Sequence, residues 1–209
     1  MIQIKQFDNQ LMKSNCYIIV DDAARHCIVV DPASEKSLNE IAFINGSNLT
    51  LDYIILTHEH TDHTWGVNAL LEIFPNVKVI TAQACKNELP KADQAYFSLY
   101  MDNPNYEYHV RKVDITTEEL NWHMNWQEYQ ITFIPTPGHS IGSMCFSLED
   151  NLFTGDTIMN FKPFIKKKNG GSWEEYYCSV RKIKSIFPAE TNVFPGHGNC
   201  FLLEDYVSY

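Results

Sequence analysis

The chain has 209 residues, of which 44% are hydrophobic and 20% charged, a composition that excludes a disordered, collagen-like or coiled-coil protein. It carries 16 Lys and Arg against 26 Asp and Glu, which gives a net charge of −10. This acidity argues against a nucleic-acid partner, because binding a phosphate backbone normally requires a basic surface. The length suits a single domain, and we expect it to span residues 1–209.

The N-terminal segment predicts a cytoplasmic protein without a membrane partner. Residues 1–7 alternate polar and apolar side chains, which is typical of a strand and not of a secretion signal. No apolar run reaches the roughly 18 residues that a membrane-spanning helix needs. The six cysteines contain no Cys-x-x-Cys pair, so we expect reduced thiols. Cys16 and Cys27 are the one pair that a hairpin could bring face to face.

The first part of the chain is predicted to alternate strands and helices. The expected elements are a hairpin of residues 16–20 and 27–30, a helix from Ser34 to Gly46, a strand at 53–57, a helix at 64–74 and a strand at 77–80. The strand at 53–57 is apolar throughout, which is typical of a strand buried on both faces. It leads directly into a cluster of polar residues, so the chemistry is expected at a strand end.

The second part begins with an aromatic-rich segment at about 85–125 that lacks a steady periodicity, and we expect a partly helical insertion there. Two roles stay open for it, a lid over the substrate or buried packing. Strands are then predicted at 129–134, 143–148 and 151–154, a helix at 172–187 and a strand at 192–194.

The densest chemical signal is the run His58-Glu59-His60-Thr61-Asp62-His63. On a tight loop, the first and third residues can face one metal while the fifth and sixth face a second metal about 3.5–4 Å away. The alternative is a solvated loop with histidines present by chance. Three of only eight histidines within six positions make that alternative improbable. Glu59 is expected to lie behind the ligands or to face solvent.

Three later motifs each place one ligand-type side chain in a glycine-containing turn after an apolar run. They are Thr136-Pro137-Gly138-His139-Ser140, Phe153-Thr154-Gly155-Asp156-Thr157 and Phe194-Pro195-Gly196-His197-Gly198. Each is weak alone. Together with the histidine-rich run they provide enough ligands for two metal ions. The other histidines, His26, His109 and His123, are expected to be structural or exposed.

This set of motifs resembles the metallo-β-lactamase-fold hydrolases, and Val30-Asp31-Pro32 matches the usual opening of that family. The resemblance covers nearly the whole chain and implies an α/β fold, a four-layer αββα sandwich with the site at one edge of its two sheets. It implies His58, His60 and His139 as ligands of a first metal. It further implies Asp62, His63 and His197 as ligands of a second, with Asp156 as the bridging carboxylate.

Two details of the motifs narrow the resemblance. Asp156 stands where one β-lactamase branch has Cys, which points to the glyoxalase-II-like, thioesterase and lactonase branches. His60, in place of Glu, argues against the diiron flavoprotein branch. A ligand set of imidazoles and carboxylates suits two Zn²⁺ ions, with Fe or Mn as alternatives.

The implied activity is that of a dinuclear metal-dependent hydrolase. A metal-bound hydroxide would attack the carbonyl of a small thioester or lactone, with Asp62 and Asp156 as the catalytic carboxylates that hold the metals and orient the hydroxide. The alternatives are a phosphodiesterase or nuclease of the same fold, a mononuclear iron persulfide dioxygenase, and a binding module without turnover.

The substrate and the oligomeric state are not assigned by the sequence. Lys166, Lys167 and Lys168 could attract a carboxylate or phosphate of a small-molecule substrate, or they could be a solvated charge run. Only 12 residues follow His197, so the helical domain with which glyoxalase II helps to bind glutathione is not expected, and glutathione specificity is doubtful.

Overall fold

The computed structural model describes residues 1–9, 12–91, 105, 107–167 and 170–208. Its described strands form two six-stranded sheets, with spatial orders β1-β2-β3-β4-β5-β6 and β12-β11-β10-β9-β8-β7. The first sheet consists of β1 (Ile2–Asp8), β2 (Asn15–Asp21), β3 (His26–Val30), β4 (Thr50–Ile55), β5 (Lys78–Thr81) and β6 (Ile115–Thr116). The second consists of β7 (His123–Trp126), β8 (Tyr129–Pro135), β9 (Met144–Leu148), β10 (Asn151–Gly155), β11 (Asn192–Pro195) and β12 (Phe201–Leu202).

Both sheets are mixed. The antiparallel β1–β2–β3 meander continues into the parallel strands β4, β5 and β6. In the second sheet, β7 to β10 are antiparallel, β11 is parallel to β10, and β12 is antiparallel to β11. The helices are α1 (Leu38–Gly46), α2 (Thr61–Thr64), α3 (Val67–Ile73), α4 (Gln83–Glu88) and α6 (Trp173–Ile186), with short 3₁₀ turns η1 (Leu89–Lys91) and η3 (Leu203–Asp205).

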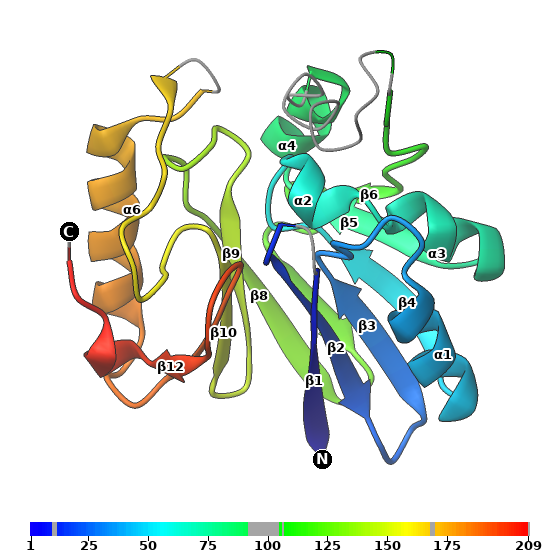
Figure 1. The fold of residues 1–209 in the computed structure, drawn as a ribbon. Helices are drawn as coiled ribbons and strands as arrows, with labels where there is room; N and C mark the ends of the chain where they lie inside the picture. Colours follow the sequence, from blue (N-terminus) through cyan, green and yellow to red (C-terminus); the bar gives the residue numbers. More distant parts are fainter. Residues whose placement is uncertain (10–11, 92–104, 106, 168–169, 209) are drawn as a thin grey trace.

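The elements stack in four layers (Figure 1). Helix α6 covers the outer face of the second sheet, the two sheets face each other, and α1 and α3 cover the outer face of the first sheet. This arrangement confirms the predicted αββα sandwich. In the part of the chain that the structure describes, no helix is long and apolar enough to cross a bilayer.

Successive side chains along the strands of the second sheet point to opposite faces, so they contribute to two separate hydrophobic cores. Phe133, Phe146 and Phe153 pair side by side across β8, β9 and β10 and join the core between the sheets. Their chain neighbours Ile134, Cys145 and Leu152 point the other way, into the core beneath α6. The strands are therefore buried on both faces, which explains why they read as nearly continuous apolar runs.

The predicted hairpin is confirmed, since β2 and β3 pair antiparallel. Its register places Cys27 opposite Val20 and Tyr17 opposite Val30, so Cys16 and Cys27 do not face each other. All six cysteines are free, as expected.

Two predicted helices have different bounds in the structure. The helix expected from Ser34 begins at Leu38, because Ser37 adopts a left-handed conformation with φ of 42° that a helix cannot include. The helix expected at 64–74 begins at Val67, as α3, and Thr64 instead ends the separate short helix α2. The break between the two helices occurs at Gly66, whose N–H donates to the carbonyl of Pro32 at 2.7 Å instead of to a helical carbonyl.

The predicted insertion at 85–125 is partly helical, through α4 and η1, as expected. It also contains strand β6, and β7 begins within it, so this segment extends both sheets in a way that the sequence did not predict. Residues 92–104 and 106 lie outside the described residues, so the lid stays a prediction.

Candidate metal centre

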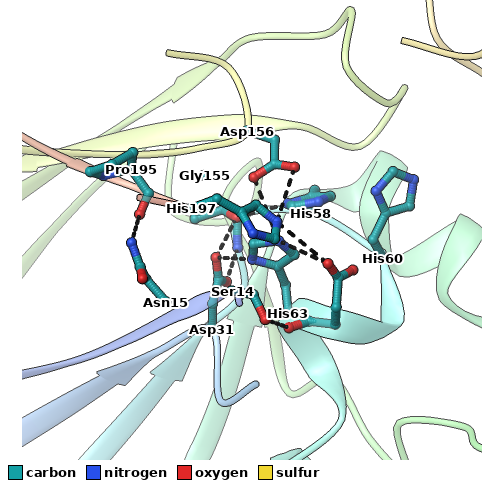
Figure 2. A network of polar contacts seen from close by, with 12 residues as sticks. Ser14, Asn15, Asp31, His58, His60, His63, Gly155, Asp156, Pro195 and His197 are labelled. Carbon is teal, nitrogen blue, oxygen red and sulfur yellow. Dashed lines mark hydrogen bonds and ion pairs between the residues drawn. The ribbon is translucent and has the colours of Figure 1, made fainter. Parts of the chain in front are cut away.

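The candidate ligands follow the C-terminal ends of strands, which meet at one edge of the sandwich. The His58–His63 segment follows β4, His139 follows β8, Asp156 follows β10 and His197 follows β11. Because the strand ends are fixed by buried backbone pairing, the turns that follow them hold these side chains at fixed positions. Figure 2 shows side chains from both sheets converging there.

His58, His60 and His139 form one group, in which one potential ligand atom of each residue lies within 4.8 Å of the others. The Nε2 of His139 lies 2.9 Å from the Nδ1 of His60. His58 and His139 are buried and His60 is partly buried. Three imidazoles facing one point in this way match the first predicted ligand group, which we call the first triad.

Asp62, His63 and His197 form a second group, here called the second triad. The Nε2 of His197 lies 3.3 Å from the Nε2 of His63 and 3.4 Å from Oδ2 of Asp62, and the His63–Asp62 distance is 3.8 Å. Tetrahedral zinc with bonds of about 2.0–2.1 Å holds its ligand atoms about 3.3 Å apart. The second triad therefore has the spacing that one such ion requires.

Asp156 lies between the two triads. Its Oδ2 is 3.3 Å from Nε2 of His139, in the first triad, and 3.6 Å from Nε2 of His197, in the second. Its Oδ1 is 3.5 Å from Nε2 of His63. A carboxylate within reach of both groups has the position of a bridging ligand.

Unsatisfied polar atoms also gather at this site. Among the described residues, the buried side-chain atoms without a hydrogen-bond partner are Nε2 of His58, Nδ1 of His139 and Oδ1 of Asp156. Leaving such atoms buried without a partner is costly, so each needs an explanation. Cations between the two triads would satisfy Nε2 of His58 and Oδ1 of Asp156, so the residues present fit a metal centre.

Burial and neighbouring charges shift the pKa values of the side chains in the cluster. Burial lowers the pKa of His58 well below its usual range and that of His139 to about 4, so both rings are neutral at pH 7. Burial would raise the pKa of Asp62 and Asp156, but neighbouring imidazoles outweigh it and keep both carboxyls ionised. For His63, burial is outweighed by Asp62 and Asp156, which raise its pKa to about 10. Neutral imidazoles and ionised carboxylates are the forms that bind divalent cations.

Asp31 is the main site residue to which the sequence gave no role beyond its place in the family's opening motif. Its carboxylate accepts hydrogen bonds from Oγ1 of Thr57 at 2.6 Å and from Nδ1 of His63 at 3.1 Å. The Thr57 hydroxyl in turn lies 3.0 Å from Nδ1 of His58. Asp31 also groups geometrically with His58 and His63. Because Oδ2 takes both of these hydrogen bonds and Oδ1 accepts the backbone N–H of Thr57 at 2.8 Å, we assign Asp31 to orienting the two rings, so that their Nε2 atoms stay available to cations.

Of the two positions expected for Glu59, behind the ligands or facing solvent, the structure shows the first. Glu59 is buried, and its Oε2 accepts a hydrogen bond from Oγ of Ser140 at 2.9 Å. Burial raises the pKa of its carboxyl. Since Glu59 lies between His58 and His60, and Ser140 follows His139, this contact ties together the two loops that carry the first triad.

The remaining candidates lie outside the cluster. Lys166 and Lys167 are exposed, with Nζ of Lys166 4.5 Å from the centre of the Phe164 ring, and Lys168 lies outside the described residues. His26 pairs with Asp52 at 2.8 Å. His109 and His123 are exposed. None of these three histidines belongs to a metal-compatible group within the described residues.

Known proteins resemble this chain in sequence and in fold. The chain is 30% identical over 201 residues to the probable polyketide biosynthesis zinc-dependent hydrolase BaeB of Bacillus velezensis, over 93% of this chain and 77% of that protein. It is 29% identical over 189 residues to a hydroxyacylglutathione hydrolase of Pelagibacter ubique, over 90% of this chain and 67% of that protein.

Among solved structures, the B3 metallo-beta-lactamase BLEG-1 has a TM-score of 0.81 at 23% identity, over 97% of this chain and 95% of that one. That likeness concerns the fold. The family model of the metallo-beta-lactamase superfamily matches residues 10–197, which include every candidate ligand. The chain therefore belongs to the metallo-beta-lactamase superfamily.

Proposed function

We propose that this protein is a dinuclear metal-dependent hydrolase that cleaves a small thioester or lactone. The observation that carries the proposal is the position of Asp156, whose carboxylate lies 3.3 Å from His139 of the first triad and 3.5 Å from His63 of the second. One carboxylate within reach of two triads is the arrangement expected of a bridged pair of cations. The relatives named as a zinc-dependent hydrolase and a hydroxyacylglutathione hydrolase support the same reaction class.

Two bound cations would lower the pKa of a shared water to about 7 and polarise the carbonyl that it attacks. The chain's residues hold the reacting groups in place. Asp62 and Asp156 are ionised and next to the space between the triads, so each can accept a hydrogen bond from the water and orient its lone pair. Asp31 and Thr57 keep the rings of His63 and His58 turned toward the same space.

A thioester is the preferred substrate class because of its leaving group. A thiolate needs little protonation, whereas an alkoxide or an amide nitrogen needs an acid. Within the described residues of the centre, the seven candidate ligands would be occupied by the cations, and Asp31 and Glu59 are hydrogen-bonded to Thr57, His63 and Ser140. No titratable group of this cluster is left to act as a dedicated general acid.

We propose two Zn²⁺ as the resident cations, since imidazole and carboxylate donors suit zinc and one relative is named as zinc-dependent. Iron and manganese bind the same donors and are the alternatives. A small molecule, without nucleic acid or membrane, is the proposed partner, and the cytoplasm the proposed location.

A substrate panel tests the proposed reaction. Protein reconstituted with zinc would be assayed with acyl thioesters, lactones, β-lactams and phosphodiesters, and iron-loaded protein with a persulfide in an oxygen electrode. We expect the wild type to hydrolyse thioesters or lactones. The Asp156→Asn variant should lose this activity, and it serves as the control for contaminating hydrolases. Preferential phosphodiester cleavage, or oxygen consumption by the iron form alone, would replace the proposal by that activity.

Lys166 and Lys167 are proposed to attract an anionic group of the substrate. Both are exposed on the segment that follows Asp156, so their charges are accessible. Changing both to Gln should raise KM for an anionic thioester and leave a neutral thioester unaffected. Lys78→Gln, at the start of β5 and therefore at the opposite edge of the sheet, is the matched control. An unchanged KM for the anionic substrate would reject this role.

A further inference from the structure

The residues of the second triad lie in short segments with little regular secondary structure. His197 lies after the end of β11, and Asp62 lies in the four-residue helix α2. The N-terminal segment Lys13–Asn15 lies against both of them. Ser14 forms an isolated β-bridge with His197, and Asn15 donates its backbone N–H to the carbonyl of Gly196 at 2.7 Å.

The Asn15 side chain donates hydrogen bonds to the backbone before and after His197. Its Nδ2 lies 2.9 Å from the carbonyl oxygen of Pro195 and 2.8 Å from that of Gly198 (Figure 2 shows the first of these contacts). The Asn15 residue is only 3% exposed, so water cannot readily replace these hydrogen bonds. An amide can donate two N–H bonds, which an Asp carboxylate at this position could not.

Neighbours of Asn15 act on the ligands directly. The carbonyl oxygen of Lys13 lies 3.0 Å from Nδ1 of His197 and accepts a hydrogen bond from it, which leaves Nε2 to face His63 and Asp62. The Ser14 hydroxyl, which is fully buried, donates to the backbone carbonyl of Asp62 at 2.7 Å. Three consecutive residues therefore hold the ring orientation of one ligand and the backbone of another.

These contacts are confined to one half of the centre. Within the described residues, the polar contacts of Lys13–Asn15 with the centre reach the second triad and the 195–198 turn, and none reaches the first triad. The first triad has its own tie, the hydrogen bond between Glu59 and Ser140. Besides Asp31, which contacts His63 and, through Thr57, His58, each half thus has contacts of its own from a different part of the chain.

We propose that Asn15 and Ser14 are positioning residues for the second cation, so that the segment Lys13–Asn15 sets the affinity of the second site without changing that of the first. This inference rests on the proposed dinuclear centre. Groups that orient metal ligands typically change metal affinity by 10- to 100-fold when they are removed. We expect a loss of that size at the second site, and less than about twofold at the first.

The test is a zinc and cobalt titration of metal-free protein, with stoichiometry measured by mass spectrometry and two dissociation constants from chelator competition. The variants are Asn15→Asp, which keeps the size of the side chain but removes its N–H donors, and Ser14→Ala. Asn192→Ala removes an exposed amide at the start of β11, the end of that strand opposite the 195–198 turn, and is the matched control. Ser14→Thr restores a hydroxyl and should recover affinity.

Wild type and Asn192→Ala should bind two cations, and Asn15→Asp and Ser14→Ala should bind the first normally and the second at least tenfold more weakly. Circular dichroism of the metal-free forms checks the fold, and if Asn15→Asp does not fold, the Ser14 pair decides. Equal weakening of both sites, or of neither, in folded variants would overturn this inference alone. A wild-type chain that binds one cation would overturn the dinuclear proposal, and this inference with it.

Discussion

Gly196 shows how little space the candidate ligands leave for other atoms. A Cβ added there would come within 2.3 Å of Oδ1 of Asp156 and 2.8 Å of Cε1 of His63. Neither contact is tolerable, and both neighbours are candidate ligands held by other hydrogen bonds. The turn after β11 therefore needs glycine because the backbone passes directly against the centre.

Gly196→Ala should consequently displace Asp156 and His63 and weaken the binding of both cations by more than tenfold. Gly46→Ala is the control, since nothing lies within 4 Å of the Cβ it would add. The control should bind metal normally and be as stable as wild type or more stable by about 0.4–1 kcal/mol. Metal affinity from chelator competition checks both, and normal metal binding by Gly196→Ala would contradict the packing described.

Two histidines of the centre should titrate in opposite directions from their usual pKa of about 6.5. His63, between Asp62 and Asp156, has a pKa raised to about 10, and the buried His139 has a pKa lowered to about 4. In metal-free protein His63 should therefore keep its proton through neutral pH, while His139 should have lost its own. Because a cation must displace the His63 proton, affinity for the second cation should rise with pH up to about 10.

Nitrogen-15 NMR of histidine-labelled, metal-free protein measures these two protonation states. A His63 signal that titrates near its usual pKa would contradict the assigned charge environment. So would a second-site affinity that stays constant as the pH is raised from neutral toward the pKa of His63.

The candidate ligands could be predicted from the sequence because they are close together in motifs, such as the run from His58 to His63. The contacts of the residues that orient them could not. A position behind the ligands was one of two expected for Glu59, but its partner Ser140, like the partners of Asp31 and Asn15, is far away in the chain, and only the folded backbone shows these pairings. Residue type alone does not distinguish them from other buried polar residues.

At the scale of secondary structure, helix α6 packs its apolar side against the second sheet, which carries three of the candidate ligands. Ile183 on this helix is fully buried in the core beneath it, whereas Ile186, three residues later, is 53% exposed. Truncating a buried isoleucine removes apolar contacts and leaves a cavity. Ile183→Ala should therefore lower the free energy of unfolding by about 2–5 kcal/mol.

Ile186→Ala, on the same helix, should change the free energy of unfolding by less than about 0.5 kcal/mol. Urea unfolding of metal-free protein measures both, without the added stability that bound cations contribute. Equal losses in the two variants would mean that α6 is packed differently from the arrangement in Figure 1.

Long elements with one buried face, such as β8 and α6, were predicted nearly in full, because the spacing of their apolar residues reflects burial. The division between α2 and α3 was not predicted, because it depends on the contact of Gly66 with the distant Pro32. Strands β6 and β12 have only two residues each, too few for a periodic pattern. Local signals therefore predict elements that bury their own faces, and miss those that tertiary contacts create.

At the scale of the whole molecule, each triad draws on both halves of the sandwich. His58, His60, Asp62 and His63 follow a strand of the first sheet, and His139, Asp156 and His197 follow strands of the second. Each cation would therefore connect the two sheets. The order of strands within the sheets places these ends together, and chain order alone does not specify it. The net charge of −10 includes carboxylates in this centre, whose repulsion bound cations would relieve.

The central claim is that seven side chains hold two cations through a shared Asp156. Counting bound zinc in reconstituted wild type, His197→Ala and Asp156→Asn tests it most directly. Wild type should bind two ions, His197→Ala should lose mainly one, and Asp156→Asn should bind both weakly. One ion or fewer in wild type, or equal and negligible losses in the two variants, would contradict the claim.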